Sequence, residues 1–419
     1  MKNIFIYTIF TLSFLVSQDT RSTIFSTGTP ETEEGYLISG DTSVADRFSV
    51  GIDYAMEAFR VTLAMESMFA TVAVSIHEDS NNEPGEILGT WDLDLSTTAP
   101  REYLVYTFDD CITFEAGHNY WISVKSEDST SISRWIYSPL EQYTYSSSTD
   151  AQETWNTSIG FAGSAKVYAE AFYEPDPLHG DVNLDNQLNV LDVVTMVAYV
   201  TGNTDLTDEQ INLGDVNLDH EIDVLDIVQL INTIVNENAM PSFSLLDFNP
   251  NSEYNGQYIG PETFTGEVSC YYFGKQGWSM CRHRFGVLND LYEELLSEGI
   301  NDVKFMGING YDYIDDSYSC MICDQPEECS GCDDVNIIPW AQDLDDGQNC
   351  LNENEGLCES GDEDGDVWHM WDISLRDFLI LDREGKLVTR INLTYNNPDP
   401  NSTCGENYQT IKNLILNAR

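Results

Sequence analysis

The hexapeptide Gly180-Asp-Val-Asn-Leu-Asp185 returns unchanged as Gly214-Asp-Val-Asn-Leu-Asp219, 34 residues further along the chain. The likeness continues, because Val190-Leu-Asp192 matches Val224-Leu-Asp226 and an apolar run follows each copy. Solenoids of helical repeats share this period, but they need three or more copies. Two copies in register therefore predict one small module, in which each loop leads into an apolar helix.

Each copy reads as a twelve-residue loop whose alternating positions carry oxygen-bearing side chains. Positions 1, 3, 5, 7, 9 and 12 are Asp181, Asn183, Asp185, Gln187, Asn189 and Asp192 in the first loop, and Asp215, Asn217, Asp219, Glu221, Asp223 and Asp226 in the second. Such a loop can wrap a hard cation with six or seven oxygens at about 2.3–2.6 Å. A solvated turn would not produce the pattern twice, so the repeat predicts two bound calcium ions.

On these residues, positions 179–237 resemble the type I dockerin module. The resemblance implies two calcium loop–helix repeats that bind cohesin domains and assemble secreted enzymes onto scaffolds or cell surfaces. Two features depart from the family. The glycine of loop position 6 is Asn186 or His220, and the polar pair at positions 10 and 11 is Val190-Leu191 or Val224-Leu225. The partner is therefore expected to be a cohesin domain or, alternatively, a neighbouring domain of the same chain.

The chain of 419 residues is strongly acidic, with 72 Asp and Glu against 18 Lys and Arg, a formal net charge of −54. This charge opposes binding to nucleic acids and to anionic lipid. Hydrophobic residues make up 42% and aromatic residues 11% of the chain, which favours several folded domains over disorder. Two Ca²⁺ would change the charge only to about −50, so most of the acids are expected on a solvated surface.

The N-terminus is typical of a secretory signal peptide. Lys2 precedes the apolar run Ile4 to Val16, so residues 1–17 are expected to direct export. The run is shorter than the roughly 20 residues of a membrane span. The ten cysteines fit a secreted or cell-surface bacterial protein, because disulfides persist outside the cytosol.

Residues 20–172 are predicted to form an all-β sandwich, jelly-roll-like in its connections. Short alternating runs such as Ala70-Thr-Val-Ala-Val-Ser-Ile76 and Tyr120-Trp-Ile-Ser-Val124 are separated by turn clusters. The phrases Ile76 to Leu88 and Ala116 to Val124 look like accessory β-sandwich domains of secreted bacterial proteins. The aromatic residues either form a carbohydrate-binding face or, more commonly, fill the core.

Residues 262–419 alternate between strand and helix in the order of a thioredoxin-like α/β domain. The segments Gly266 to Leu291 and Asp366 to Leu393 look like the N-terminal domain of selenoprotein P, over about residues 262–395. The resemblance implies a selenocysteine-x-x-cysteine motif with thiol–disulfide or peroxidase activity. The family's cysteine falls on Cys281 and its selenocysteine on Trp278.

An indole cannot attack a disulfide, so the nucleophile of the motif is missing as the sequence is written. Cys281 itself is a candidate catalytic residue, because a helix N-terminus and the basic run Arg282-His-Arg284 would favour a thiolate. The alternative is a buried or disulfide-bonded cysteine. A further hypothesis is that Trp278 is a mistranslated selenocysteine, since some genetic codes read UGA as Trp; selenium would be a cofactor only then.

An insertion at 318–362 is rich in cysteine, with Cys320, Cys323, Cys329, Cys332, Cys350 and Cys358. Disulfides, a zinc site and a thiol relay to Cys281 are all compatible with it, and the short spacing favours disulfides. The acids Asp362-Glu-Asp-Gly-Asp366 are either a further calcium site or a solvated loop.

Two functions remain open from the sequence. The first is an exported thiol or selenol oxidoreductase carried on a dockerin-like module, active in disulfide exchange or peroxide reduction. The second is a non-catalytic assembly or adhesion protein. A polysaccharide-degrading enzyme ranks last, because no carboxylate pair can be placed at glycosidase geometry.

Overall fold

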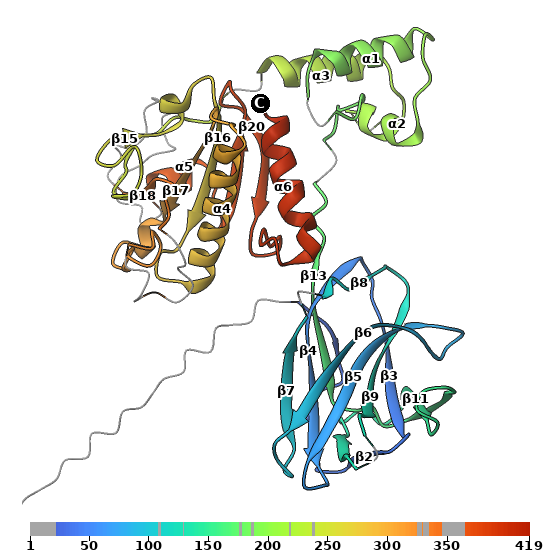
Figure 1. The fold of residues 1–419 in the computed structure, drawn as a ribbon. Coiled ribbons are helices and arrows are strands. Elements are labelled where there is room, and N and C mark those ends of the chain that lie inside the picture. The colour runs from blue at the N-terminus through green and yellow to red at the C-terminus, as the bar shows by residue number, and fades with distance from the viewer. Residues whose placement is uncertain are drawn as a thin grey trace, which may run out of the picture.

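The computed structural model describes residues 22–107, 110–128, 130–175, 178–185, 188–217, 219–236, 239–324, 329, 335–345 and 365–419. The predicted signal peptide, Asn186, Gln187 and most of the cysteine-rich insertion lie outside these residues. An all-β part, a small helical part and an α/β part follow one another along the chain (Figure 1). Within the described residues, no helix is both long and apolar enough to cross a bilayer.

The N-terminal part consists of two antiparallel sheets, as the sequence predicts. The first runs in the order β1 (Ser22–Ser26), β13 (Ala165–Ala171), β4 (Tyr54–Met65), β10 (Ile132–Ile136) and β2 (Gly35–Ser39), with β7 (Arg101–Tyr106) and β8 (Thr113–Phe114) also pairing with β4. The second runs β12 (Asn156–Gly160), β11 (Tyr143–Ser148), β3 (Ser43–Ser49), β9 (Asn119–Ser126), β5 (Ala70–Asp79) and β6 (Pro84–Leu95).

Side chains of both sheets meet in one core, because alternate residues of each strand point inward. Val72, Val74 and Ile76 of β5 lie in it, together with the aromatic rings of Phe59 and Trp135. All five side chains are 0% exposed. These large aromatics therefore fill the core, which is the more common of the two predicted roles.

The helical part consists of α1 (Val190–Val200), α2 (Asp208–Gly214) and α3 (Val224–Asn236). Val182, Met196, Ile227 and Leu230 form its small core. The sequence predicts α1 and α3 but not α2. The start of α2 is stabilised by a capping box, in which the Thr207 side chain accepts from the backbone N–H of Gln210.

The C-terminal sheet has the order β18 (Trp340–Gln342), β17 (Val303–Asn309), β16 (Val268–Gly274), β19 (Asp377–Leu381) and β20 (Leu387–Asn392). Its first three strands are parallel, and β19 and β20 run antiparallel to their neighbours. The helices α4 (Ser279–Ser297) and α6 (Glu406–Asn417) pack on one face. The hairpin β14 (Leu245–Leu246) and β15 (Tyr258–Ile259) and the short α5 (Asp366–Met370) pack on the other. This is the predicted thioredoxin-like arrangement, with the 3₁₀ turns η2 (Pro261–Phe264), η3 (Tyr311–Tyr313) and η5 (Thr403–Gly405) between its elements.

The β-sandwich and the thioredoxin-like domain are joined by a disulfide between Cys111 and Cys404. The sequence left Cys111 without a partner. The backbone N–H of Tyr173, just after β13, donates to the Asn407 side chain of α6 at 2.6 Å. These contacts fix the end of the sandwich against the C-terminal helix (Figure 1).

Candidate docking face and candidate thiol site

The last residue of each predicted calcium loop closes the loop from the start of the following helix. The Asp192 carboxylate is 0% exposed and accepts from the backbone N–H groups of Val182 at 3.0 Å and Asn189 at 2.9 Å. In the second loop, Asp226 accepts in the same way from Asn217 at 3.1 Å and Asp223 at 2.9 Å. The two loops therefore share one local geometry.

The first residue of each loop is also a buried carboxylate. Asp181 accepts from the N–H of Asp185 at 3.1 Å, and Asp215 accepts from that of Asp219 at 3.0 Å. His220, at loop position 6, adopts the left-handed φ of +74° that this turn requires and that glycine adopts most easily. The departure from glycine thus leaves the shape of the second loop intact.

The side chains of the loops suit a hard cation. The described residues contain no group of three or more His, Cys, Asp or Glu side chains arranged as a metal site. The predicted ligands instead mix carboxylates with Asn side chains and backbone oxygens, an all-oxygen set of the kind that Ca²⁺ prefers. Gln187, predicted to be the ligand at position 7 of the first loop, lies outside the described residues.

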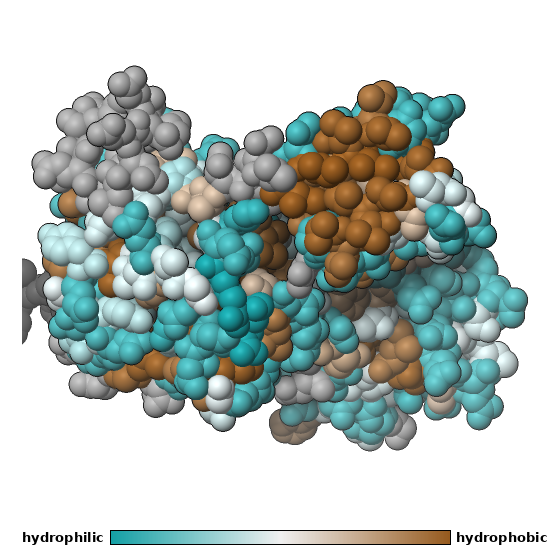
Figure 2. All heavy atoms as spheres, turned by 90° about the horizontal axis from the view of Figure 1, so that it is seen from above, coloured by the Kyte–Doolittle hydropathy of each residue, from teal (hydrophilic) through white to brown (hydrophobic). Residues whose placement is uncertain are grey.

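A continuous apolar surface covers α1 and α3 (Figure 2). Eight exposed side chains form it, and each residue of one helix has a counterpart 34 positions away: Val190, Leu191, Val194 and Val197 on α1, and Val224, Leu225, Val228 and Ile231 on α3. We call these eight residues the docking face. Leu191 is 55% and Leu225 62% exposed, so the structure does not pack them on a neighbouring domain.

Cys281 is the third residue of α4 and is one of two free cysteines among the described residues. Its side chain is 0% exposed, and its carbonyl accepts from the Tyr272 hydroxyl at 3.2 Å. Trp278 precedes the helix as its N-cap and is 47% exposed. Burial raises the pKa of the other free thiol, Cys270, well above the ordinary value, which disfavours its thiolate.

The cation at the Cys281 sulfur comes from an unexpected position. Arg376 Nη1 lies 3.9 Å from Cys281 Sγ, and Arg376 Nε donates to Thr394 Oγ1 at 2.8 Å. The sequence predicted that the basic run 282–284 would supply the positive charge next to Cys281. For two of these residues this prediction was wrong. His283 contacts the Asp399 carboxylate at 2.8 Å, and Arg284 donates to the Leu393 carbonyl at 3.0 Å.

The side chain of residue 278 also lies beside a cation. The Lys275 ammonium is 4.6 Å from the ring centroids of both Trp278 and Tyr313. Gln276, next to Lys275, holds the segment before α4 in place, because its side chain is buried and accepts from Trp340 Nε1 at 3.1 Å. A nucleophile at position 278 would therefore have a positive charge next to it.

The described part of the cysteine-rich insertion contains disulfides. Cys320 and Cys329 are bonded to each other, and Cys323 is disulfide-bonded as well. These three sulfurs are therefore not zinc thiolates, and the disulfide interpretation is confirmed for them. Cys332, Cys350, Cys358 and the acids 362–364 lie outside the described residues.

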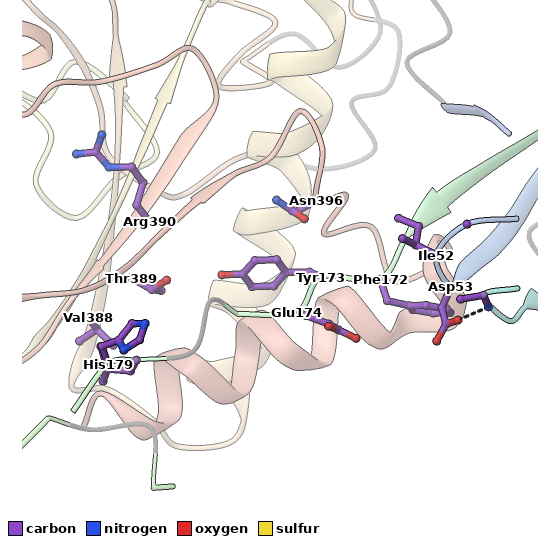
Figure 3. Close-up of a pocket in the computed structure, with 13 residues that line it drawn as sticks. Ile52, Asp53, Phe172, Tyr173, Glu174, His179, Val388, Thr389, Arg390 and Asn396 are labelled. Carbon is purple, nitrogen blue, oxygen red and sulfur yellow. Dashed lines mark hydrogen bonds between the residues drawn. The ribbon is translucent and has the colours of Figure 1, made fainter. Parts of the chain in front are cut away.

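A pocket of about 740 Å³ lies where the sandwich, the linker after β13 and the edge of β20 meet (Figure 3). Tyr173, Glu174, His179 and Thr389 line it. Arg390 also lines the pocket. Its guanidinium donates a hydrogen bond to the carbonyl of Trp371 at 2.7 Å and so points away from the other labelled side chains. We assign this pocket no chemistry.

The sequence missed Arg376, Thr394 and the partner of Cys111. An isolated arginine 95 residues from a cysteine carries no local signal. The pairing of Cys111 with Cys404 could have been considered, because both lie outside the cysteine-rich insertion.

A family model for the dockerin type I domain matches residues 179–235. The chain resembles several solved structures only remotely. The Plasmodium yoelii thioredoxin peroxidase I is 14% identical, with 43% of this chain and 87% of that chain covered and a TM-score of 0.30. The mitochondrial 2-Cys peroxiredoxin of Plasmodium falciparum is 15% identical, with 43% of this chain and 90% of that chain covered and a TM-score of 0.29. The thioredoxin domain of a Bacteroides vulgatus thiol-disulfide oxidoreductase is 15% identical, with 43% of this chain and 96% of that chain covered and a TM-score of 0.26. No curated protein matches the chain.

Proposed function

We propose that the protein is exported, binds two calcium ions in residues 179–237, and docks through the docking face onto a cohesin domain. One observation carries the proposal: a segment that matches the dockerin type I domain exposes an apolar face built from both of its repeats. The location follows from the same family, whose modules act outside the cell.

The residues at the two specificity positions favour an apolar partner surface. Loop positions 10 and 11 are Val190-Leu191 and Val224-Leu225, where the family carries polar residues. Burying one such side chain stabilises a complex by about 1.5–3 kcal/mol. Because the contact is apolar, we expect binding to depend little on salt, in spite of the charge of −54.

Aspartate substitutions test this docking. The full chain is passed over an immobilised type I cohesin domain in the presence of calcium. The double variant Leu191→Asp/Leu225→Asp is expected to lose binding, because it buries a charge in each half of the face. Ile159→Asp is the matched control, since Ile159 is 62% exposed but lies on β12 of the sandwich. Equal binding by the double variant and the control would rule the docking face out.

A second function, thiol chemistry in the thioredoxin-like domain, is favoured by the contact between Arg376 and Cys281. In disulfide exchange the Cys281 thiolate forms a bond to one sulfur of a substrate disulfide, and the other sulfur leaves as a thiolate. An external thiol would then resolve the mixed disulfide. If residue 278 is selenocysteine, it attacks first, peroxide becomes a possible substrate, and Cys281 resolves.

Disulfide-reductase and peroxidase assays of the full chain, with Cys281→Ser as the comparison, test this function. Activity that survives the substitution would exclude Cys281 as the catalytic residue. The codon for residue 278 is a separate test, because UGG would exclude selenocysteine. If both assays are negative, the alternative is a non-catalytic assembly or adhesion protein, and a link to polysaccharide degradation would then rest on the docking partner alone.

A further inference from the structure

We propose that the disulfide between Cys111 and Cys404 is a redox-sensitive latch that keeps Cys281 covered. The proposal rests on the proposed thiol function of Cys281 and adds its regulation. Its physical basis is one segment, residues 393–405, which contacts the thiol site at one end and the β-sandwich at the other.

The sandwich end of the segment is held by a bond and a buried carboxylate. Cys404 is joined to Cys111, and Glu57 of β4, only 2% exposed, accepts from Ser402 Oγ at 2.9 Å and from the N–H of Thr403 at 3.2 Å. Both groups of the sandwich grip the same turn. The turn therefore moves with the sandwich for as long as the disulfide is intact.

The other end of the segment contacts residues next to the thiol. Thr394 holds Arg376 next to the Cys281 sulfur, and the Leu393 carbonyl accepts from Arg284 of α4. Asp399 contacts His283. Helix α4, which carries Cys281, is thus tied to the segment at several points, and the sulfur beneath is 0% exposed.

The turn that carries Cys404 has an unfavourable backbone conformation. Thr403 and Cys404 have left-handed φ values of 47° and 56°, which are unfavourable for residues other than glycine. Opening the disulfide removes the covalent constraint on this turn, so its backbone is free to relax. Cys111 is exposed and Cys404 half-buried, which leaves the bond within reach of a reductant.

The switching step needs a dithiol as reductant. One thiolate of the dithiol bonds to Cys111 Sγ or Cys404 Sγ, the Cys111–Cys404 bond breaks, and the released sulfur takes up a proton. The second thiol of the dithiol then displaces the remaining cysteine and closes its own disulfide. Two electrons and two protons have passed to Cys111 and Cys404, which end as free thiols.

Labelling of Cys281 with iodoacetamide, followed by peptide mass mapping, tests the latch. In the full chain, Cys111→Ser/Cys404→Ser is expected to label at Cys281 about ten times faster than the oxidised wild type, because opening of the segment limits access. Wild-type protein that is reduced briefly with a dithiol and then desalted should show the same increase in labelling rate. This second measurement keeps the test valid if the double variant does not fold. Ile159→Ser, a substitution on the exposed surface of β12, is the control and should label like the wild type.

Labelling rates that agree within roughly a factor of two between oxidised wild type, reduced wild type and the double variant would overturn the latch. The test is independent of turnover. If Cys281→Ser leaves the catalytic activity unchanged, the proposed thiol function fails, whereas the labelling rates still decide whether the disulfide controls access to this sulfur.

Discussion

Arg376 Nη1 lies 3.9 Å from Cys281 Sγ, although the two residues are 95 positions apart in the chain. The guanidinium is held by Thr394 and precedes β19, at the edge of the sheet where α4 begins. It supplies a fixed positive charge to a buried sulfur. This contact is the main reason to retain thiol chemistry for a domain in which a tryptophan, Trp278, stands three residues before Cys281.

Arg376→Gln should slow the reaction of Cys281 with a small disulfide by roughly three- to ten-fold, because loss of the charge raises the energy of the thiolate by about 0.7–1.4 kcal/mol. Arg376→Lys should retain most of the rate, since it keeps a cation. The rate is followed by release of the leaving thiol at neutral pH. If both variants react faster than the wild type, Arg376 acts as a cover and not as a charge.

Trp278→Cys should create a redox-active dithiol with Cys281. Residue 278 is the N-cap of α4, three residues before Cys281, and stands beside the Lys275 ammonium. We expect a new intramolecular disulfide after mild oxidation and a clear gain in disulfide-reductase activity. Trp278→Cys/Cys281→Ser serves as the control and should gain neither. A single variant that stays fully reduced would argue against this geometry.

Replacement of a loop carboxylate should remove one calcium ion and weaken the helices. Asp192→Ala and Asp226→Ala each delete a buried acceptor of two or more backbone N–H groups as well as a predicted ligand. Calorimetry should then count one ion in place of two, and the helical circular dichroism of residues 190–236 should fall on chelation. Asp205→Asn, outside both loops, is the control; an unchanged count of two would refute the ligand set.

Asp46 predicts a pH dependence of the sandwich. Its side chain is 0% exposed, one oxygen accepts from the Gly163 N–H at 2.7 Å, and the other has no partner among the described residues. Burial raises the pKa of Asp46 well above its ordinary 3.8. The folded carboxyl thus holds its proton while the unfolded one ionises, so stability falls as the pH rises above 3.8.

Asp46→Asn removes this cost. At pH 7 its free energy of unfolding should exceed that of the wild type by roughly 1–3 kcal/mol, and near pH 3 the two should agree. Denaturant unfolding of the sandwich at both pH values measures the difference. A gain of equal size at both pH values would show that ionisation of Asp46 is not its origin.

The sequence predicted those parts of the fold that local patterns encode. The repeat from Gly180 specified both loops and the helices α1 and α3, and alternation in strands such as β5 specified the sandwich. Strand and helix order was also enough for the thioredoxin-like domain, because a parallel pair and an antiparallel hairpin leave few arrangements of one sheet.

Contacts between distant segments were not predictable in the same way. The pairing of Cys111 with Cys404, the grip of Glu57 on Ser402 and the approach of Arg376 to Cys281 depend on how separate elements pack. The prediction from the basic run 282–284 failed for this reason. Residues that are neighbours along a helix point their side chains to different sides, so closeness in sequence to Cys281 does not bring a side chain to its sulfur. His283 and Arg284 consequently reach the segment after β20 and not the sulfur.

The most direct test of the account is a calorimetric titration of the full chain with a type I cohesin domain, before and after calcium is removed. We predict one-to-one binding in calcium, no binding after chelation, and recovery when calcium is restored. Binding of equal strength in the presence of a chelator, or none in calcium, would contradict a calcium-organised docking face on α1 and α3.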